Sequence, residues 1–440
     1  MKSQGHILLV NPWIYDFAAY NLWVEPLGLL TIGAALRQAG HRVTVVDCLA
    51  PHPSVPRPGP QGAGKFLKTM VAKPEPVAFV PRRYGRYGLP LEVFDRSLAG
   101  CPAPDLVLVA SGMTYWYPGV VEAIRRIRDH FGPVPVALGG VYATLCAGHA
   151  RQHSGADWVI EGPGLVPALE LASRVTGNDS GLVFDDATSW PAPAHDLLPR
   201  SYAGLLTAWG CPYRCTYCAS RRLQPAFLQR QPEAVVREVA ECARRGVRDF
   251  SFYDDALLLN AERHLVPFLE AILSQGLAVR FHTPNGLHAR SVTPELAGLM
   301  RQAGFVTVYL SLETVDSARQ EATGGKVTTE AFAQAIGYLQ AAGFGPWELG
   351  AYILAGLPGQ PLGEVEGSVR FVHGLGVQAK LALFSPIPGT PDGDEALPPE
   401  ADPLLHNNTV YPYLLGEGYV RELQRIKLLA KEGNAALRSE

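Results

Sequence analysis

The sequence predicts an α/β protein that contains two parallel sheets, one in each half of the chain. Short runs of β-branched residues alternate with amphipathic helical stretches over most of the 440 residues, and this alternation is typical of parallel sheets covered by helices. A chain of this length can hold two or three domains with proper cores. The composition is ordinary for a globular protein, and the net charge of −3 gives no electrostatic case for nucleic acid as a partner.

The first half contains five predicted strands and two predicted helices. The strands cover 7–10, 42–46, 106–110, 134–138 and 158–160, and the helices cover 27–38 and 120–130. Small and polar residues follow the later strands, namely Ser111, Gly112, Thr114, Gly139 and Gly140. Because ligands of open α/β sheets bind at the carboxyl ends of the strands, residues 1–176 are predicted to form a nucleotide- or cofactor-binding domain.

Two segments interrupt this alternation. Residues 51–100 contain nine prolines and eight Lys or Arg against three Asp or Glu, and so long a connection favours a functional loop or cover. Its Arg82, Arg83 and Arg86 are suited to bind an anion such as phosphate, although a solvated loop with incidental charge is the simpler interpretation. Residues 177–200 are rich in turn-forming residues and are predicted to be a linker.

Three cysteines lie close together at the start of the second half, after a short strand predicted over 205–210. Cys211, Cys215 and Cys218 have the spacing CxxxCxxC, and three thiolates on one loop can hold a four-iron cluster while one iron stays open to a small molecule. A zinc site would need a fourth ligand, and none lies nearby. A disulfide framework is disfavoured because seven cysteines are sparse in a chain of this length and their number is odd. The other four are expected to be buried small apolar residues, at Cys48, Cys101, Cys146 and Cys242.

The second half repeats strand–helix units of about 30 to 40 residues, which indicates a parallel barrel or partial barrel of the TIM type over 201–400. Strands are predicted at 249–253, 279–282, 307–312 and 348–354, and helices at 234–244, 264–273, 294–302 and 328–342. A helix over 416–437, in a helical extension over 401–440, is expected to dock on this barrel. Barrel active sites lie at strand carboxyl ends, where this chain has the segments 252–255, 311–314 and 355–359. Taken singly, an acidic pair can cap a helix and Leu-Pro-Gly is a common turn.

The cysteine spacing, with the aromatic Tyr217 before the last cysteine, resembles the cluster loop of the radical S-adenosylmethionine (SAM) superfamily. The resemblance implies that Cys211, Cys215 and Cys218 ligate a 4Fe-4S cluster, that SAM chelates the fourth iron, and that reduction yields a 5′-deoxyadenosyl radical in a six-unit partial barrel. It also implies SAM contacts at the strand ends: Asp254 or Asp255 near the amine, Ser311 and Glu313 at the ribose or amine, and the Gly356–Pro358 turn along the adenine. The Asp pair departs from the common Gly-Gly-Glu, and Gln360 stands where a glutamate is frequent.

The first half resembles the flavodoxin-like (Rossmann-type) cobalamin-binding domain that precedes the barrel in a branch of this superfamily. On that resemblance Ser111, Gly112, Thr114, Gly139 and Gly140 accommodate the cofactor's nucleotide tail, since glycine permits close backbone approach. The loop over 11–20 lacks the DxHxxG motif and any histidine. If cobalamin binds, its lower face meets a non-histidine side chain, water or nothing; the alternative is that the cofactor has been lost.

Together these resemblances imply a cobalamin-dependent radical SAM enzyme that methylates an unactivated carbon of a small-molecule metabolite, using methylcobalamin and the deoxyadenosyl radical. The alternatives are ring contraction, cyclisation or another rearrangement, and a redox sensor without catalysis; a tRNA methylthiotransferase would need further cysteines and a basic tail. An electron donor such as flavodoxin or ferredoxin is expected, with no nucleic acid, no membrane span and a cytoplasmic location. No catalytic residue is assigned. His282 and His288 could move protons or be structural, and Tyr115–Tyr117 could line the cofactor space or simply pack.

Overall fold

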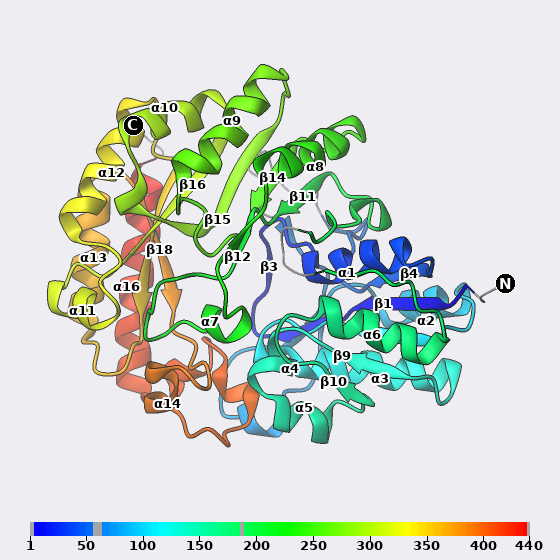
Figure 1. Cartoon of the computed structure of the whole chain (residues 1–440). Coiled ribbons are helices and arrows are strands. Elements are labelled where there is room, and N and C mark those ends of the chain that lie inside the picture. Colours follow the sequence, from blue (N-terminus) through cyan, green and yellow to red (C-terminus); the bar gives the residue numbers. More distant parts are fainter. Residues whose placement is uncertain (1–3, 56–63, 185–188, 438–440) are drawn as a thin grey trace. The chain divides into compact units, whose positions relative to one another are not determined.

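The computed structural model describes residues 4–55, 64–184 and 189–437. The chain divides into two compact units, and Figure 1 colours it along the sequence from blue to red. The first unit comprises Met1–Arg200, Arg222–Gln224 and Ala401–His406, and the second comprises Ser201–Arg221, Pro225–Glu400 and Asn407–Glu440. The first unit therefore takes in the segment over 177–200, of which 185–188 lie outside the described residues, and six residues from the start of the C-terminal extension.

The first unit is built on a five-stranded parallel sheet with the order β10-β9-β8-β1-β4. Its strands are β1 (His6–Asn11), β4 (Arg42–Asp47), β8 (Leu106–Val109), β9 (Val136–Leu138) and β10 (Trp158–Val159). Numbered along the chain, the order is 5-4-3-1-2, which is the flavodoxin-like arrangement, and the order reverses between β1 and β8. A ligand of this unit is therefore expected at the carboxyl ends of those two strands.

Helices cover both faces of this sheet, because successive apolar residues of each strand point to opposite sides. Leu8, Val10 and their neighbours pack with α2 (Leu91–Ala99), α3 (Tyr117–Phe131) and α5 (Ala147–His153). Ile7 and Leu9 pack on the other face with α1 (Leu27–Gln38) and α6 (Leu165–Thr176). The short α4 (Val141–Leu145) follows β9. The α/β class and the flavodoxin-like topology are as predicted.

The segment over 51–100, expected as a functional loop or cover, contains short strands and a helix in its described part. In its described part, β6 (Lys68–Met70) and β7 (Gly85–Tyr87) join β2 (Ile14–Asp16) in an antiparallel sheet, and β5 (Gly64–Lys65) pairs with β3 (Tyr20–Asn21). The segment also contains the short η1 (Glu75–Val77) and supplies α2. Proline-rich composition hid these elements because each strand is only two or three residues long.

Polar contacts hold the late segments to the first unit. In the stretch that contains η3 (His195–Leu197), the His195 ring lies 3.1 Å from the Glu25 carboxylate, and Arg200 forms a buried ion pair with Asp47. In the stretch that contains η6 (Pro403–His406), His406 Nδ1 lies 3.1 Å from the Thr114 hydroxyl in η2 (Thr114–Trp116). Residues far along the chain thus complete this unit.

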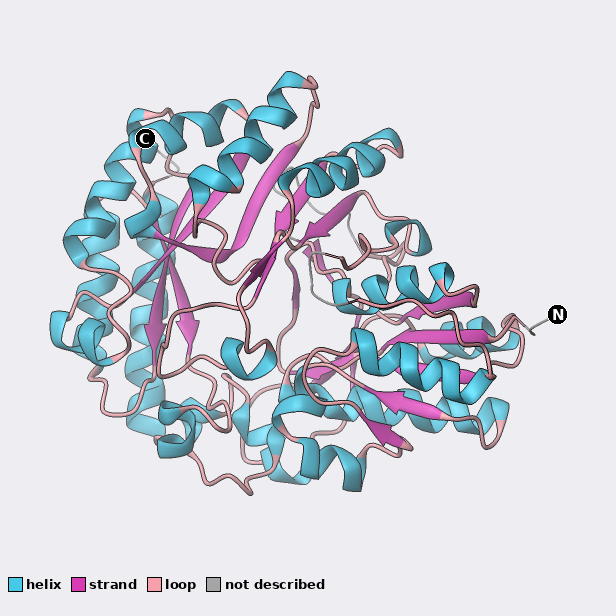
Figure 2. Cartoon of the chain, in the orientation of Figure 1, coloured by secondary structure: helices cyan, strands magenta, loops and turns pink. Residues whose placement is uncertain are grey.

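The second unit contains a six-stranded parallel sheet with the order β11-β14-β15-β16-β17-β18, and Figure 2 shows its strands as an arc with the helices outside. The strands are β11 (Tyr202–Leu205), β14 (Asp249–Phe252), β15 (Arg280–His288), β16 (Phe305–Glu313), β17 (Leu349–Ala355) and β18 (Gln378–Leu383). The crossover helices are α8 (Pro232–Arg244), α9 (Leu265–Ser274), α10 (Pro294–Gln302), α12 (Thr329–Ala341) and α13 (Leu362–Gly374). The predicted partial barrel is confirmed.

Shorter elements complete the second unit. They are the hairpin of β12 (Ala208–Trp209) and β13 (Leu228–Gln229), the helices α7 (Ser220–Leu223), α11 (Ser317–Ala322), α14 (Pro391–Ala396), α15 (Tyr411–Leu414) and α16 (Glu417–Ala436), and the turns η4 (Ala261–Arg263) and η5 (Ala289–Ser291). The strand predicted over 205–210 is wrong in its bounds, because β11 ends at Leu205 and β12 leaves in a separate hairpin. The tail helix α16 docks on β18 and α13, as expected. No described helix is both long enough and apolar enough to cross a bilayer.

Candidate functional site

The cysteine loop follows β12 and is fixed by contacts inside the second unit. The Thr216 hydroxyl donates to the Asp392 carboxylate at 2.7 Å, and the Asp392 N–H donates back to the Thr216 carbonyl at 3.2 Å. The Tyr213 ring packs edge-on against His288 with centroids 4.4 Å apart. A Cβ built on Gly324 would lie 3.2 Å from the carbonyl oxygen of Arg214, so this glycine allows another turn to lie against the loop.

The loop offers three free thiols with no disulfide among them. Burial raises the pKa of Cys211 to about 11, and the charges of Asp255, Cys218 and Cys215 add to this effect, so these groups lie near one another. In the described residues, the side chains of no three His, Cys, Asp or Glu are already arranged as a metal site. The donor chemistry nevertheless fits an iron–sulfur cluster, because the thiols share one loop and mutual repulsion of thiolates is relieved by iron.

A buried ion pair supports the loop from the end of β16. The Lys326 ammonium lies 2.6 Å from a carboxylate oxygen of Glu313, and both side chains are 12% exposed. Lys326 also lies 5.8 Å from the centroid of the Tyr217 ring. Burial raises the pKa of Cys215, and the charge of Lys326 opposes this rise. The Tyr217 hydroxyl contacts both Cys215 and Glu313, and burial raises the pKa of Tyr217. Lys326 was missed from the sequence, since a lysine after two glycines gives no signal of burial.

Glu313 has a left-handed backbone, with φ of +67°, at a bulge in the pairing of β16 with β17. A non-glycine residue in this region is strained, and such strain is concentrated at functional sites. The bulge turns the Glu313 side chain toward Lys326 and the cysteine loop instead of continuing the strand's alternation. Glu313 is thus brought to the loop, as a predicted SAM contact should be.

Asp254 is a buried carboxylate that is satisfied on one side only. Its Oδ1 accepts from the Thr207 hydroxyl at 2.6 Å, the Thr207 N–H at 3.0 Å and the Ala208 N–H at 2.7 Å. Its Oδ2 has no partner among the described residues, and burial raises the pKa of Asp254 to about 7. A buried carboxylate oxygen without a donor is costly, so the site fits a cationic or hydrogen-bonding group such as an ammonium.

Asp255 lies beside the cysteines. Its side chain is solvent-accessible yet enclosed by protein on most sides, and this enclosure raises its pKa while a hydrogen bond from Ser220 opposes the shift. The Ser220 hydroxyl also lies 3.2 Å from Cys218 Sγ. The combination of access and enclosure is what a residue that lines a ligand cavity should show.

The two histidines of β15 have different surroundings. His282 is fully buried near the start of the strand, where it contacts the Thr307 hydroxyl and the Asp249 carboxylate at 3.1 Å each. It is a satisfied structural group, and the proton-transfer interpretation is wrong for it. His288 lies at the carboxyl end, next to Tyr213, and burial with the nearby charge of Lys326 lowers its pKa to about 4. His288 is therefore neutral at neutral pH.

Ser311 pairs with His288 across β15 and β16, one step before the bulge. A Cβ built on Gly286 would lie 2.2 Å from the Ser311 hydroxyl, so the absence of a side chain at 286 leaves space for that hydroxyl. Ser311 is thus brought to the same edge of the sheet as Asp254 and Glu313.

The turn after β17 satisfies its own backbone. Gly356 has φ of +103°, and the N–H groups of Gly356 and Leu357 donate to Gln360 Oε1 at 2.9 and 3.3 Å. Gln360 Nε2 donates to the Leu354 carbonyl at 3.1 Å. The glutamine at this position therefore closes the turn, since a carboxylate could accept from the N–H groups but could not donate to the carbonyl. In this turn, which includes Pro358, the N–H groups of Gly356 and Leu357 are therefore already bonded within the protein.

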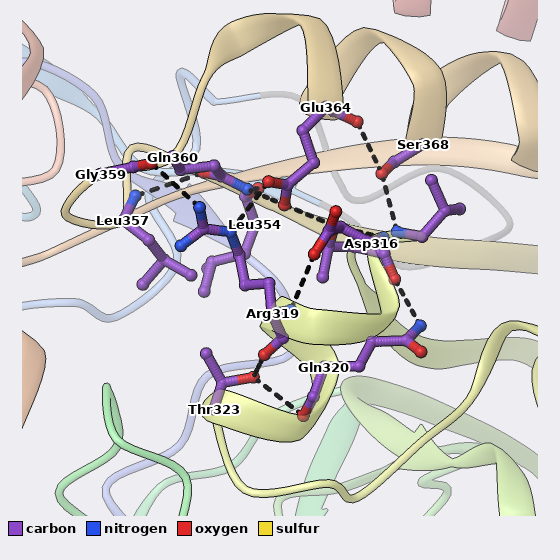
Figure 3. Close-up of polar contacts among 12 residues, drawn as sticks. Asp316, Arg319, Gln320, Thr323, Leu354, Leu357, Gly359, Gln360, Glu364 and Ser368 are labelled. Atoms are coloured by element: carbon purple, nitrogen blue, oxygen red, sulfur yellow. Dashed lines mark hydrogen bonds and ion pairs between the residues drawn. The ribbon is translucent and has the colours of Figure 1, made fainter.

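Glu364 joins this turn to the segment after β16, as Figure 3 shows for the labelled side chains. It accepts from the Thr314 hydroxyl at 2.6 Å, from Arg319 Nε at 2.9 Å and from Gln360 Nε2 at 3.1 Å. Arg319 also donates to the Gly359 carbonyl at 3.0 Å. Two predicted SAM-contact segments, one after β16 and one after β17, are thus connected through one carboxylate. This network was missed because its members lie on different strand ends.

In the first unit, the strand-end loops after β8 and β9 lie against each other. The Ser111 hydroxyl donates to the Gly139 carbonyl at 2.7 Å and accepts from the Ala143 N–H at 3.3 Å. Gly140 has φ of +101°, and a Cβ there would lie 2.4 Å from the Ser111 carbonyl oxygen. Ser111 and Gly140 therefore hold the loops after β8 and β9 together at the carboxyl edge of the sheet.

The other predicted residues of this edge differ in how they are engaged. A Cβ on Gly112 would collide with the Trp116 ring at 2.7 Å, and the Thr114 hydroxyl contacts His406 at 3.1 Å. A Cβ built on Gly139 would have a single neighbouring atom within 4 Å, the Ile160 carbonyl oxygen at 4.0 Å, so space is open there. Tyr115 is buried and Trp116 Nε1 donates to a buried carboxylate at 2.7 Å, which makes the aromatic run a packing feature of this unit.

The arginines over 82–86 do not act together. Arg82 and Arg83 are exposed, whereas Arg86 is buried with its guanidinium 5.9 Å from the Trp13 ring centroid and in contact with the Tyr15 hydroxyl. Arg86 lies within β7 whereas Arg82 and Arg83 precede that strand, so the three side chains have different surroundings and the simpler interpretation, incidental charge, is favoured.

Comparison with known proteins identifies the second unit. Residues 207–372 match the model of the Radical SAM superfamily. The chain carries a radical SAM domain. The resemblance noted in the cysteine loop is thereby confirmed for this domain, and membership implies a 4Fe-4S cluster and SAM as its cofactors.

Relatives extend the likeness of this radical SAM protein beyond that domain. The uncharacterized methyltransferase PH0819 of Pyrococcus horikoshii is 25% identical over 321 residues, covering 65% of this chain and 68% of the relative. The anaerobic magnesium-protoporphyrin IX monomethyl ester cyclase of Synechocystis is 24% identical over 344 residues, covering 70% of this chain and 60% of the relative. The structure of the radical SAM methyltransferase TsrM from Kitasatospora setae, with cobalamin and a 4Fe-4S cluster bound, has a TM-score of 0.65 at 18% identity and covers 90% of this chain and 75% of that one. The two-part fold is therefore shared.

Proposed function

We propose that this protein is a cobalamin-dependent radical SAM enzyme that methylates an unactivated carbon of a small molecule. The observation that carries the proposal is the joint presence, on one chain, of a CxxxCxxC loop at the carboxyl edge of a parallel partial barrel and a flavodoxin-like unit with open space beside Gly139. When bound, the cluster with SAM supplies a carbon-centred radical and cobalamin supplies the methyl group.

The residues of the second unit have distinct roles in this proposal. Cys211, Cys215 and Cys218 hold the cluster, while the Lys326–Glu313 pair and Tyr217 fix the loop that carries them. Asp254 offers its unpartnered oxygen to the methionyl ammonium of SAM, because a cation beside a buried carboxylate favours its ionised form. Ser311 lines the same edge, and the Gly356–Pro358 turn packs along the adenine. His288 is neutral there and can accept a proton, but we assign it no catalytic step.

The first unit would hold cobalamin at the switch point between β1 and β8, with Ser111, Gly112, Thr114 and Gly140 shaping the edge and Gly139 leaving room for the nucleotide tail. The loop after β1 contains no histidine, and its Asn11 side chain instead donates to Asp47 at 2.7 Å. We therefore propose that no imidazole of this loop meets the lower face of the corrin.

Cofactor content tests the first part of the proposal. Protein reconstituted without oxygen with iron, sulfide and hydroxocobalamin, then desalted, should contain about four iron per chain and near-stoichiometric cobalt, with both visible in its absorption spectrum. Iron without cobalt would contradict the cobalamin assignment and leave a radical SAM enzyme of another kind. A cluster whose electron paramagnetic resonance spectrum ignores added SAM would instead indicate a redox sensor.

Product analysis tests methyl transfer. With SAM labelled in its methyl group, a methylase should pass the label to product, whereas a product without label formed alongside 5′-deoxyadenosine would indicate a rearrangement or cyclisation. The likeness to a cyclase keeps that second reaction class in view. Candidate small molecules can be screened by deoxyadenosine formation above the uncoupled rate, with flavodoxin or ferredoxin as the electron donor.

A further inference from the structure

The hydroxyl of Tyr419, in the first turn of α16, is buried without a hydrogen-bond partner among the described residues. Burial raises the pKa of Tyr419 to about 12, so the group is a neutral phenol that can both donate and accept. Buried hydroxyls of tyrosine normally find a partner, and one left without costs free energy. An unpaired hydroxyl therefore calls for a functional explanation when it lies at a ligand site.

This hydroxyl lies at the turn after β17. A Cβ built on Gly356 would be 3.4 Å from the Tyr419 oxygen and 3.6 Å from Cβ of Phe384. Because residue 356 is a glycine, its own side chain does not fill the space between the turn and the Tyr419 hydroxyl. Its φ of +103° disfavours other residues. The α16 helix is fixed here because it packs on β18 and α13.

The residues around this turn are apolar. Leu357, Phe384 and Tyr411 form one apolar cluster with Leu354, and Tyr217 of the cysteine loop packs against it. The turn's N–H groups at 356 and 357 are already bonded to Gln360, so they are not available to hydrogen-bond a ligand. Tyr419 thus brings a hydrogen-bonding group to an otherwise apolar place.

A second unpartnered buried atom lies at another strand end of the same sheet. Asp254 Oδ2 follows β14, three strands from β17 in the sheet order. The Asp254 oxygen suits an ammonium, and the Tyr419 hydroxyl suits a purine nitrogen or a ribose hydroxyl. A molecule with an amino acid at one end and a nucleoside at the other satisfies both.

We propose that the Tyr419 hydroxyl hydrogen-bonds the adenosyl group of SAM, so that the C-terminal helix supplies a ligand contact from outside the matched domain. This inference rests on the proposed function, since it requires SAM to bind along this edge. Tyr419 touches the nucleoside and takes no part in bond breaking.

Tyr419→Phe removes only the oxygen and is the decisive variant. The reconstituted full-length variant should bind SAM and S-adenosylhomocysteine about three- to tenfold more weakly by calorimetry, the effect of one hydrogen bond. L-Methionine, which lacks the adenosyl group, should bind as it does to wild type, as followed by its effect on the cluster's electron paramagnetic resonance spectrum. The thermal midpoint should be unchanged or higher, because an unsatisfied buried hydroxyl is removed. Tyr338→Phe, on the outer helix α12, is the matched control and should change no affinity.

The outcomes separate the inference from the proposed function. If wild type binds no SAM, the proposed function fails first. If wild type binds SAM and Tyr419→Phe binds it equally well, the inference is wrong while the function stands. If Tyr419→Phe loses affinity for methionine as strongly as for SAM, or melts at a lower temperature, the hydroxyl has a structural role and the inference is also overturned.

Discussion

Buried polar atoms without a hydrogen-bond partner are the strongest indication of a ligand site in this protein. Asp254 is 4% exposed, with three donors on one carboxylate oxygen and none on the other among described residues. Such an arrangement is stable only if the acid is protonated or a cation lies beside it. If Asp254 binds the SAM ammonium as proposed, its protonation in the free protein is coupled to that binding.

Asp254→Asn should change how stability depends on pH. Because the folded pKa of about 7 exceeds the value of roughly 4 in an unfolded chain, the folded state binds more protons between these values. Stability therefore falls as pH rises through this window and levels off above it. Urea unfolding of the cluster-free protein between about pH 4.5 and 7.5 should show a shallower decline for the variant. Parallel curves for the two proteins would show that Asp254 is ionised throughout.

Gly140→Ala should destabilise the first unit. The added methyl would lie 2.4 Å from the Ser111 carbonyl oxygen, on a backbone with φ of +101°. We expect a loss of about 2–3 kcal/mol in the free energy of unfolding and weaker retention of cobalt after desalting. Gly148→Ala, in α5 with nothing within 4 Å of the new methyl, is the control and should be neutral or stabilising. Equal effects of the two changes would rule out the steric argument.

At the scale of elements, α13 carries two glutamates with opposite surroundings. Glu364 faces inward and holds Thr314, Arg319 and Gln360, whereas Glu366 pairs with Arg370 and Arg425 at the surface. The inner one connects the segments after β16 and β17, and the outer one connects two helices in water, where ion pairs contribute little.

Glu364→Ala should therefore loosen both segments at once. It leaves three donors without their acceptor, and we expect a loss of about 2 kcal/mol in stability together with faster amide exchange over 313–316 and 355–361. The Michaelis constant for SAM should rise more than the turnover number falls, since the network positions the binding residues and does not touch the reacting atoms. Glu366→Ala should leave exchange in both segments unchanged. Faster exchange confined to α13 would show that Glu364 supports only its own helix.

Much of the element plan could be predicted from the sequence, and the reasons for the failures are physical. The helices at 27–38 and 294–302 were predicted to the residue because apolar periodicity and helix ends coincide there. β18 was missed because its Gln378 and Lys380 weaken the apolar pattern of an edge strand. The site was predictable where chemistry depends on spacing, as in the cysteines. Lys326 and Glu364 were not, since each acquires its role from contacts distant in sequence.

At the scale of the whole molecule, two cofactor sites in two units should be separable by mutation. Replacing Cys211, Cys215 and Cys218 with alanine should remove the iron, because these thiols share the loop that carries the cluster spacing. Cobalt bound by the first unit should remain, since the residues after β8 and β9 are unaffected. Metal analysis of the desalted triple variant checks this. Loss of both metals in a folded protein would mean that cobalamin retention requires the cluster.

The segment over 401–406 determines when the first unit can finish folding during synthesis. His406 and Thr114 lie 292 positions apart, yet their contact belongs to the first unit. At about 5–20 residues per second, a ribosome makes the second of these residues roughly 15–60 s after the first. Nascent chains stalled before and after 406 should differ in protease resistance over the first unit, and equal resistance would contradict this. The amino-terminal unit, although begun first, is finished only when the barrel has been translated.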